Sequence, residues 1–214
     1  MTLHQKFFSI KPQEEFWVDV YHLMNSIIQP RPIAWISSLS PEGVANLAPF
    51  SYTNICSMNP PIVSHSIFFN RDGSEKDTLH NIRTTPSWVV GTVSSQAAAK
   101  ANLSSAPYAA ETSEFEKADV TPIPRGPEDP PFIAESPVQL ICELQQTVHL
   151  GEGAGVGTLV LGVVREIWLT ERFKDLDWKT GVPPELMDNV GRMGGDHYTR
   201  TVETFQMARA AVRK

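Results

Sequence analysis

The sequence has few of the residues that build metal sites and disulfide frameworks. Only two cysteines occur, Cys56 and Cys142, which are far apart and not in a C-x-x-C pair. They could form a bridge if the fold brings them together, but so few cysteines favour two buried thiols. The six histidines show neither H-x-H nor H-E-x-x-H spacing, so we expect no metal.

Long apolar runs and basic clusters are also missing. No segment approaches the about 18 consecutive apolar residues of a membrane span, and acidic residues interrupt the N-terminal stretch where a secretory signal would be apolar. The formal net charge is −6, and no run of Lys or Arg is long enough to follow a phosphate backbone. We therefore expect a cytoplasmic protein that binds neither membrane nor nucleic acid.

The length and composition predict one folded domain with peripheral segments. A chain of 214 residues, 41% of them hydrophobic, is long enough for one sizeable core. Residues 1–24 include the aromatic side chains Phe7, Phe8, Phe16 and Trp17. These are too many for a free tail, so we expect an irregular lead-in or short edge strand that packs on the domain or on a partner subunit. The domain itself spans 25–200, and a tail at 201–214 ends in a short frayed helix.

Apolar patterns predict a β-rich fold. Residues 33–39 carry no charge on either face of an extended run, which is typical of a strand buried on both sides. Further strands are expected at 44–50, 62–69, 87–93, 138–145 and 158–169, with short helices at 77–82, 96–103 and 113–118. The glycine-rich loop at 151–157 lacks the third glycine of G-x-G-x-x-G and precedes a strand, so it predicts a hairpin and no dinucleotide-binding domain.

The segment from Arg31 to Pro61 is the centre of the predicted fold. Residues 41–43 form a turn, and 44–50 return antiparallel to the preceding strand. Because proline cannot donate to a ladder, Pro49 is expected to end this strand, leaving 51–54 as a polar loop. The pattern alone favours a β-hairpin of an ordinary barrel followed by a polar loop.

The start of the helix at 77–82 has the properties of a phosphate site. Asp77 is the expected N-cap, and Lys76 and Thr78 place a positive charge and a hydroxyl beside the free amides of the first turn. The carboxylate of Asp77 would repel a phosphate, so we expect it to turn into the cap or toward Lys76. The alternative is a capped surface helix with a solvated lysine.

Residues 104–137 form a proline-rich excursion. Seven prolines divide it into short pieces, with one helical turn in which Ser113 and Glu116 match a capping box. Such long irregular segments are typical of functional lids or interface pieces. Elsewhere, His65 lies among apolar residues and is expected to be a core histidine with a backbone partner.

Three elements resemble the flavin reductase-like family of FMN-binding split barrels. The first comprises RPIAW at 31–35, the serine pair Ser37 and Ser38, NLAPFSYTN at 46–54 and the proline pair at 60–61. The second is KDT..NI at 76–82, and the third is RxGGxxY at 192–198. The resemblance covers roughly 25–198 and implies a Greek-key antiparallel β-barrel with peripheral helices that binds FMN.

The resemblance also suggests which residues would hold this cofactor. Small and polar groups along the central segment suit the flat ring and its hydrogen-bonding edge, Ser37 and Ser38 could reach the same edge, and Lys76 and Thr78 would hold the phosphate. Arg192 and Tyr198 are added from the resemblance alone, which places them near the flavin and often across a dimer interface. The candidate cofactor-binding residues are Ser37, Ser38, Ala48, Pro49, Phe50, Ser51, Asn54, Lys76, Thr78, Arg192 and Tyr198.

The function implied by the resemblance is that of a flavin reductase or flavoredoxin-type oxidoreductase. It would be a homodimer that passes electrons from NADH or NADPH through FMN to an unidentified acceptor, and we assign no catalytic acid or base because the redox chemistry belongs to the flavin. One alternative is an FMN-binding electron carrier or redox-sensing module without NAD(P)H turnover. Another is a dimeric scaffold whose pocket stays empty.

Overall fold

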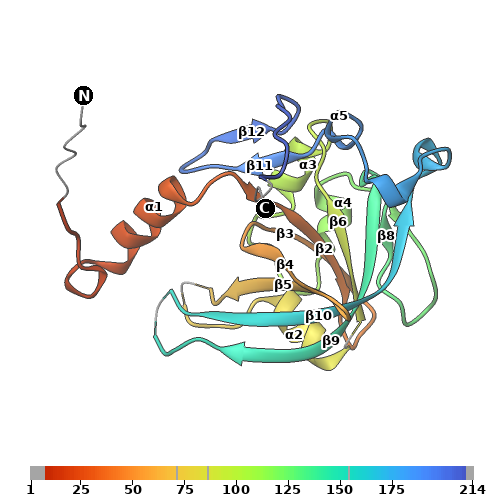
Figure 1. Ribbon diagram of the computed structural model, residues 1–214. Coiled ribbons are helices and arrows are strands. Elements are labelled where there is room, and N and C mark those ends of the chain that lie inside the picture. Colours follow the sequence, from red (N-terminus) through yellow and green to blue (C-terminus); the bar gives the residue numbers. More distant parts are fainter. Residues whose placement is uncertain (1–7, 71, 86, 154, 211–214) are drawn as a thin grey trace.

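A seven-stranded antiparallel sheet forms the body of the protein. Figure 1 shows the computed structural model, which describes residues 8–70, 72–85, 87–153 and 155–210. The strand order is β3-β2-β6-β9-β10-β5-β4. These strands are β2 (Ala34–Leu39), β3 (Ala45–Phe50), β4 (Thr53–Met58), β5 (Pro61–Phe68), β6 (Ser87–Thr92), β9 (Val138–His149) and β10 (Gly157–Leu169). The β-rich antiparallel fold predicted from the apolar patterns is confirmed.

Short helices and two small sheets surround this body. The helices are α1 (Trp17–Ile27), α2 (Asp77–Thr84), α3 (Ala98–Leu103), α4 (Glu114–Lys117) and α5 (Pro184–Met187), with 3-10 turns η1 (Pro12–Glu14), η2 (Glu171–Phe173) and η3 (Trp178–Thr180). β1 (Arg31–Pro32) pairs with β11 (Val190–Arg192), which pairs with β12 (Tyr198–Arg200), and β7 (Pro122–Ile123) pairs with β8 (Phe132–Ile133).

Strand β2 is buried on both faces because a separate core covers each of them. Ile36 points into a cluster with Ile67, Leu79 and Trp88, on the side covered by α2. Trp35 points the other way, into a cluster formed with residues of α3, α4 and the excursion. The uncharged sequence of this strand is therefore explained by its central place between two packed layers.

The expected break at Pro49 does not occur. Pro49 lies inside β3, opposite Trp35 of β2, and the strand continues to Phe50. Because β3 is at the edge of the sheet, its outer side needs no amide donor, and a proline is tolerated there. The predicted polar loop is correspondingly shorter, since Thr53 and Asn54 already belong to β4.

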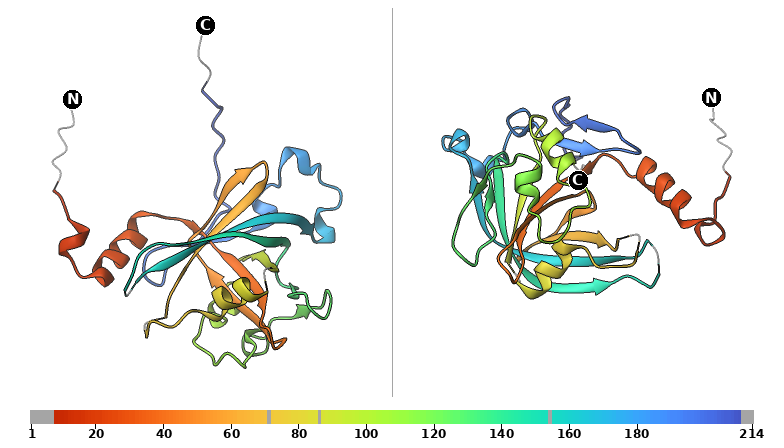
Figure 2. Two further views of the ribbon diagram at one scale, coloured as in Figure 1. Left: turned by 90° about the horizontal axis from the view of Figure 1, so that it is seen from below. Right: turned by 180° about the vertical axis from the view of Figure 1, so that it is seen from behind.

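From Trp17 on, the N-terminal lead-in is a helix rather than an irregular segment or an edge strand, whereas residues 8–16 are irregular apart from η1. Of the residues in α1 only Asn25 is buried, and Figure 2 shows the helix projecting from the body. Its C-terminal end is fixed by the buried guanidinium of Arg31, which donates to the carbonyl oxygens of Asn25 at 2.7 Å and Ile28 at 3.0 Å. A third bond from Arg31 to the carbonyl of Met193 ties this end to the β11–β12 hairpin.

Other local predictions have mixed outcomes. The glycine-rich loop joins β9 to β10 as a hairpin, as predicted. The expected tail helix is absent from residues 203–210, and the rest of the tail lies outside the described residues, as does Phe7. Cys142 is a buried free thiol, whereas the expectation of burial is wrong for Cys56, which is exposed on β4.

Candidate functional site

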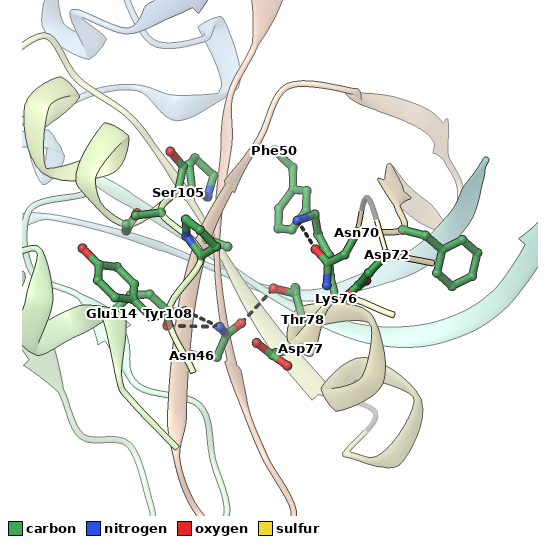
Figure 3. A pocket seen from close by; sticks show the side chains of 16 residues that line it. Asn46, Phe50, Asn70, Asp72, Lys76, Asp77, Thr78, Ser105, Tyr108 and Glu114 are labelled. Atoms are coloured by element: carbon green, nitrogen blue, oxygen red, sulfur yellow. Dashed lines mark hydrogen bonds between the residues drawn. The ribbon is translucent and has the colours of Figure 1, made fainter. Parts of the chain in front are cut away.

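One cavity of about 680 Å³ lies where β3, the start of α2 and the proline-rich excursion meet (Figure 3). Its volume is in the range of small-molecule sites. Three segments far apart in the sequence form its walls, and each supplies polar groups. The lining residues are Asn46, Ala48, Pro49, Phe50, Phe69, Asn70, Asp72, Lys76, Asp77, Thr78, Ser104, Ser105, Ala106, Pro107, Tyr108 and Glu114.

Strand β3 gives the cavity an apolar wall with one polar end. Asn46, Ala48 and Phe50 alternate along the strand and therefore lie on one face of the sheet. The structure thus brings together Ala48, Pro49 and Phe50 as the sequence predicted. Asn46 was missed, although its two-residue spacing from Ala48 would have identified it.

The start of α2 forms the polar wall opposite. The N-cap residue is Lys76, not Asp77, which is the first helical residue and makes no side-chain cap bond. The backbone N–H groups of Asp77 and Thr78 belong to the first turn, where a helix leaves its amides without intrahelical partners. Lys76 precedes them as the N-cap residue and lines the same cavity, and its ammonium donates to Asn70 Oδ1 at 2.9 Å. This wall therefore offers a cation and the positive end of a helix to a ligand.

The side-chain hydroxyl of Thr78 already has a hydrogen-bond partner, which the sequence did not reveal. Its side chain is buried, and its hydroxyl donates to Asn46 Oδ1 at 2.8 Å. A hydroxyl has only one proton to donate. Any anion at this wall would therefore be bound by the backbone N–H of Thr78 and by Lys76, rather than by the threonine hydroxyl.

Among the described residues, three carboxylates also line the cavity, and each has a different environment. Asp72 accepts hydrogen bonds from the Ser74 hydroxyl and backbone N–H, which lower the pKa of its carboxyl. Burial raises the pKa of Glu114, and the nearby charge of Asp77 raises it further. Among the described residues, Asp77 makes neither the expected cap bond nor the expected ion pair with Lys76, whose ammonium donates to Asn70 instead. The cavity is therefore mixed in charge, and Lys76 is a local cation for an anionic group.

The excursion supplies the third wall. Ser104 to Tyr108 line the cavity just after α3, and Glu114 reaches it from the first turn of α4. The expected capping box is wrong, because the Ser113 hydroxyl bonds the carbonyl of Ala45 in β3 and makes no cap bond. Periodicity gave no signal for this wall, since prolines interrupt the segment.

Six of the predicted site residues do not line the cavity, and four of these lie in β2, in β4 or just before β4. Ser37 and Ser38 are fully buried in β2. Ser38 Oγ donates to Asn46 Oδ1 at 3.1 Å and so lies directly behind the polar end of the β3 wall. Ser51 accepts a hydrogen bond from Arg31. Asn54 is exposed on β4, and its side chain accepts from the backbone N–H of Ile55.

Arg192 and Tyr198 are also outside the cavity wall. They face each other across β11 and β12, with the guanidinium carbon of Arg192 4.5 Å from the centre of the Tyr198 ring. The Tyr198 hydroxyl donates to Asn102 Oδ1 at 3.3 Å, and Asn102 precedes the lining residue Ser104 by two positions. The pair is therefore connected to the segment that lines the cavity through Asn102 of α3, but it does not line the cavity itself.

The described residues contain neither a candidate metal-binding cluster nor a helix that could span a membrane. Among those residues, no group of three or more His, Cys, Asp or Glu side chains converges on a point where a metal could bind. Within the same part of the chain, none of the helices combines the length and the apolar character needed to cross a membrane.

Comparisons with known proteins identify the family. The model of the flavin reductase like domain matches residues 24–187. An uncharacterized protein of Halalkalibacterium halodurans is 32% identical over 192 residues, which cover 90% of this chain and 91% of that protein. Nitrilotriacetate monooxygenase component B from Bacillus cereus superposes with a TM-score of 0.87 at 30% identity, covering 95% of this chain and 100% of the other.

A third protein supports the fold alone. A flavin reductase with a split barrel domain from Shewanella frigidimarina matches at 21% identity with a TM-score of 0.79, and the match covers 92% of this chain and 96% of that one. The predicted split barrel is thereby confirmed. The family match covers most of the chain, including β3, the start of α2 and the excursion, which build the cavity. This chain belongs to the flavin reductase-like domain family.

Proposed function

We propose that this protein is an FMN-dependent oxidoreductase of the flavin reductase or flavoredoxin type, and that the cavity between β3, α2 and the excursion holds its FMN. The observation that carries the proposal is that one cavity joins the apolar stretch Ala48–Phe50 to Lys76 and the amides at the start of α2. A flat apolar ring with a negatively charged chain requires this combination of an apolar wall and a local cation.

The residues present fit the group. Ala48, Pro49 and Phe50 would contact the ring system, while Lys76 and the backbone N–H groups of Asp77 and Thr78 would bind the phosphate. Bound FMN would supply the two-electron chemistry, and the chain would supply orientation and exclude water. Ser51 and Asn54 make other hydrogen bonds and are not needed in this arrangement.

The proposed electron donor is NADH or NADPH. The family name and the similarity to a monooxygenase component support a reductase, and the chain shows no separate dinucleotide-binding domain in the part that the structure describes. The nicotinamide would therefore have to enter over the exposed face of the cofactor. The competing function, an electron carrier or redox sensor without NAD(P)H turnover, uses the same cavity.

A spectroscopic experiment separates the two functions. We expect the FMN-loaded protein to lose the visible flavin absorbance on anaerobic addition of NADH or NADPH, faster than free FMN does under the same conditions. Loss at the rate of free FMN with both donors would favour the carrier. If the protein gains no yellow colour after incubation with FMN and desalting, the remaining hypothesis is a dimeric scaffold whose pocket stays empty.

The surface of the isolated chain favours a homodimer, which we propose as the working form. The exposed apolar side chains of α1 and the apolar groove beside them would stay in contact with water in a monomer.

The apolar face of α1 is the surface that a second copy would cover. Trp17, Tyr21, Met24 and Ile27 are all exposed, and an amphipathic helix gains most of its stability from packing its apolar face. A groove of about 380 Å³ between this helix and the barrel residues Tyr52 and Phe68 continues the same apolar surface. In such a dimer we propose that Arg192 and Tyr198 lie near the partner's cofactor.

A charge on α1 tests this assembly. We expect wild-type protein to elute with about twice the mass of one chain in light scattering, and Met24→Asp with Ile27→Asp to elute as a monomer, because two buried carboxylates would each oppose the contact. The matched control is Ile123→Asp, an equally exposed apolar residue in β7. Monomeric wild-type protein, or a double variant that stays dimeric, would refute the assembly.

A further inference from the structure

The proline-rich excursion is joined to the other two walls of the cavity through one buried carboxylate. Glu114 is only 6% exposed, and its oxygens accept from Asn46 Nδ2 at 2.9 and 3.0 Å. The backbone N–H of Leu47 donates to the same carboxylate at 2.8 Å. Three donor contacts from β3 therefore converge on a side chain that belongs to the excursion.

Further hydrogen bonds continue this network behind the cavity wall. Asn46 Oδ1 accepts from the hydroxyls of Ser38 and Thr78, and Asn81 Nδ2 donates to Ser38 Oγ at 3.1 Å. Asn46, Ser38, Thr78 and Asn81 are all buried. The network thus links the excursion, β2, β3 and α2, which are the elements that build and support the cavity.

Glu114 determines which side-chain groups in this network donate hydrogen bonds and which accept them. The carbonyl oxygen of Asn46 already serves two hydroxyl donors, so its amide nitrogen must face the carboxylate. A carboxylate can accept at both oxygens, whereas a glutamine would place a second NH₂ opposite that of Asn46. An acceptor-only side chain is therefore required at position 114.

We propose that Glu114 is a positioning residue that acts as a latch, because its hydrogen bonds hold the excursion against β3. Through Asn46 it also fixes the polar end of the β3 wall, against which the ligand binds. The inference rests on the proposed flavin site for its ligand but on the contacts alone for the latch. Because Ser104 to Tyr108 belong to the same excursion, loss of the latch opens the third wall of the cavity.

The latch is tested by exchanging the side-chain amide of Asn46 and the carboxylate of Glu114 between the two positions. Glu114→Gln alone sets two NH₂ groups against each other, and Asn46→Asp alone sets two carboxylates against each other. In the combined variant Asn46→Asp with Glu114→Gln, the amide introduced at position 114 donates to the new carboxylate at position 46, and its oxygen accepts from Leu47, so all donors are again matched. The control is Glu116→Gln, the same substitution at an exposed position of α4.

We expect riboflavin, measured by quenching of its fluorescence, to bind about tenfold more weakly to each single variant at pH 7 and within about threefold of wild type to the exchange variant. The melting temperature should fall in the singles and recover in the exchange variant. Riboflavin is the probe because the phosphate of FMN itself titrates near pH 6.

The pH profile supplies a readout that a purely structural residue would not change. As pH falls through the raised pKa of Glu114, protonation puts a donor opposite Asn46, so riboflavin affinity of the wild type should drop, and Glu114→Gln should lack this step. The other described ionisable groups around the cavity are Asp77 and Lys76 of α2 and, on its loops, Asp72 and Tyr108, and they are the same in both proteins.

Three outcomes are decisive. Single variants that bind riboflavin and melt like wild type would overturn the latch, as would folded singles whose defects the exchange does not repair. If wild-type protein binds no flavin at all, the proposed function fails. The recovery of melting temperature in the exchange variant still decides the latch independently.

Discussion

Replacing Lys76 with alanine is expected to weaken FMN binding about 10- to 100-fold and to leave riboflavin binding within about threefold of wild type. Among the described residues, Lys76 is the only lysine or arginine that lines the cavity, and it lies beside the amides of the first turn of α2. A charge-assisted hydrogen bond contributes about 1.5–3 kcal/mol, which corresponds to this range of affinities. Riboflavin lacks the phosphate and should not detect the change.

The comparison is made by titrating both flavins into each variant and following fluorescence quenching. Lys117→Ala, which removes an exposed lysine from α4, is the control for a general change in charge. Equal losses for the two flavins in Lys76→Ala would show that the phosphate binds elsewhere. An unchanged affinity for FMN would have the same meaning.

The stability of the fold is expected to fall by about 3 kcal/mol between pH 7 and pH 4 because of one buried histidine. Burial lowers the pKa of His65 from 6.5 to about 4. The unfolded chain therefore binds a proton in this window that the folded chain does not, so the stabilisation is complete above pH 6.5 and is lost as pH falls toward 4. His65 Nδ1 pairs with the Thr53 hydroxyl at 2.9 Å, rather than with the backbone as predicted from the sequence.

Urea unfolding at pH 7 and pH 4 measures this effect. His65→Gln should show a loss of unfolding free energy smaller by about 3 kcal/mol than that of wild type, since other titrating groups are common to both proteins. The matched control is His22→Gln, the same substitution at an exposed position of α1. If wild type and His65→Gln lose the same amount, His65 is not the buried neutral group described above.

The strands of the fold could be predicted because their sequence pattern reports directly on burial. Residues 33–39 are apolar or small on both faces, and β2 has a packed layer on each side. The missed helix α1 also had a signal: Trp17, Val20, Tyr21, Met24 and Ile27 recur at helical spacing. The aromatic content of residues 1–24 predicted packing but not this regular helix.

The candidate site was only partly predictable, for a physical reason. Ala48, Pro49 and Phe50 and the start of α2 could be placed because each belongs to a regular element with a defined face or end. The wall that contains Glu114 comes from an irregular segment whose position is set by tertiary hydrogen bonds, and no periodic pattern reports these. Asp77 was misplaced as the N-cap because its residue type favours a cap that Lys76 occupies.

A crystal structure of the protein grown with FMN tests the proposed cofactor site most directly. We expect electron density for the ring system against Ala48 to Phe50, with the phosphate within hydrogen-bonding distance of Lys76 Nζ and the backbone N–H of Thr78. Density for FMN in the groove between α1 and Tyr52, or at any site that does not contact both β3 and α2, would contradict this placement.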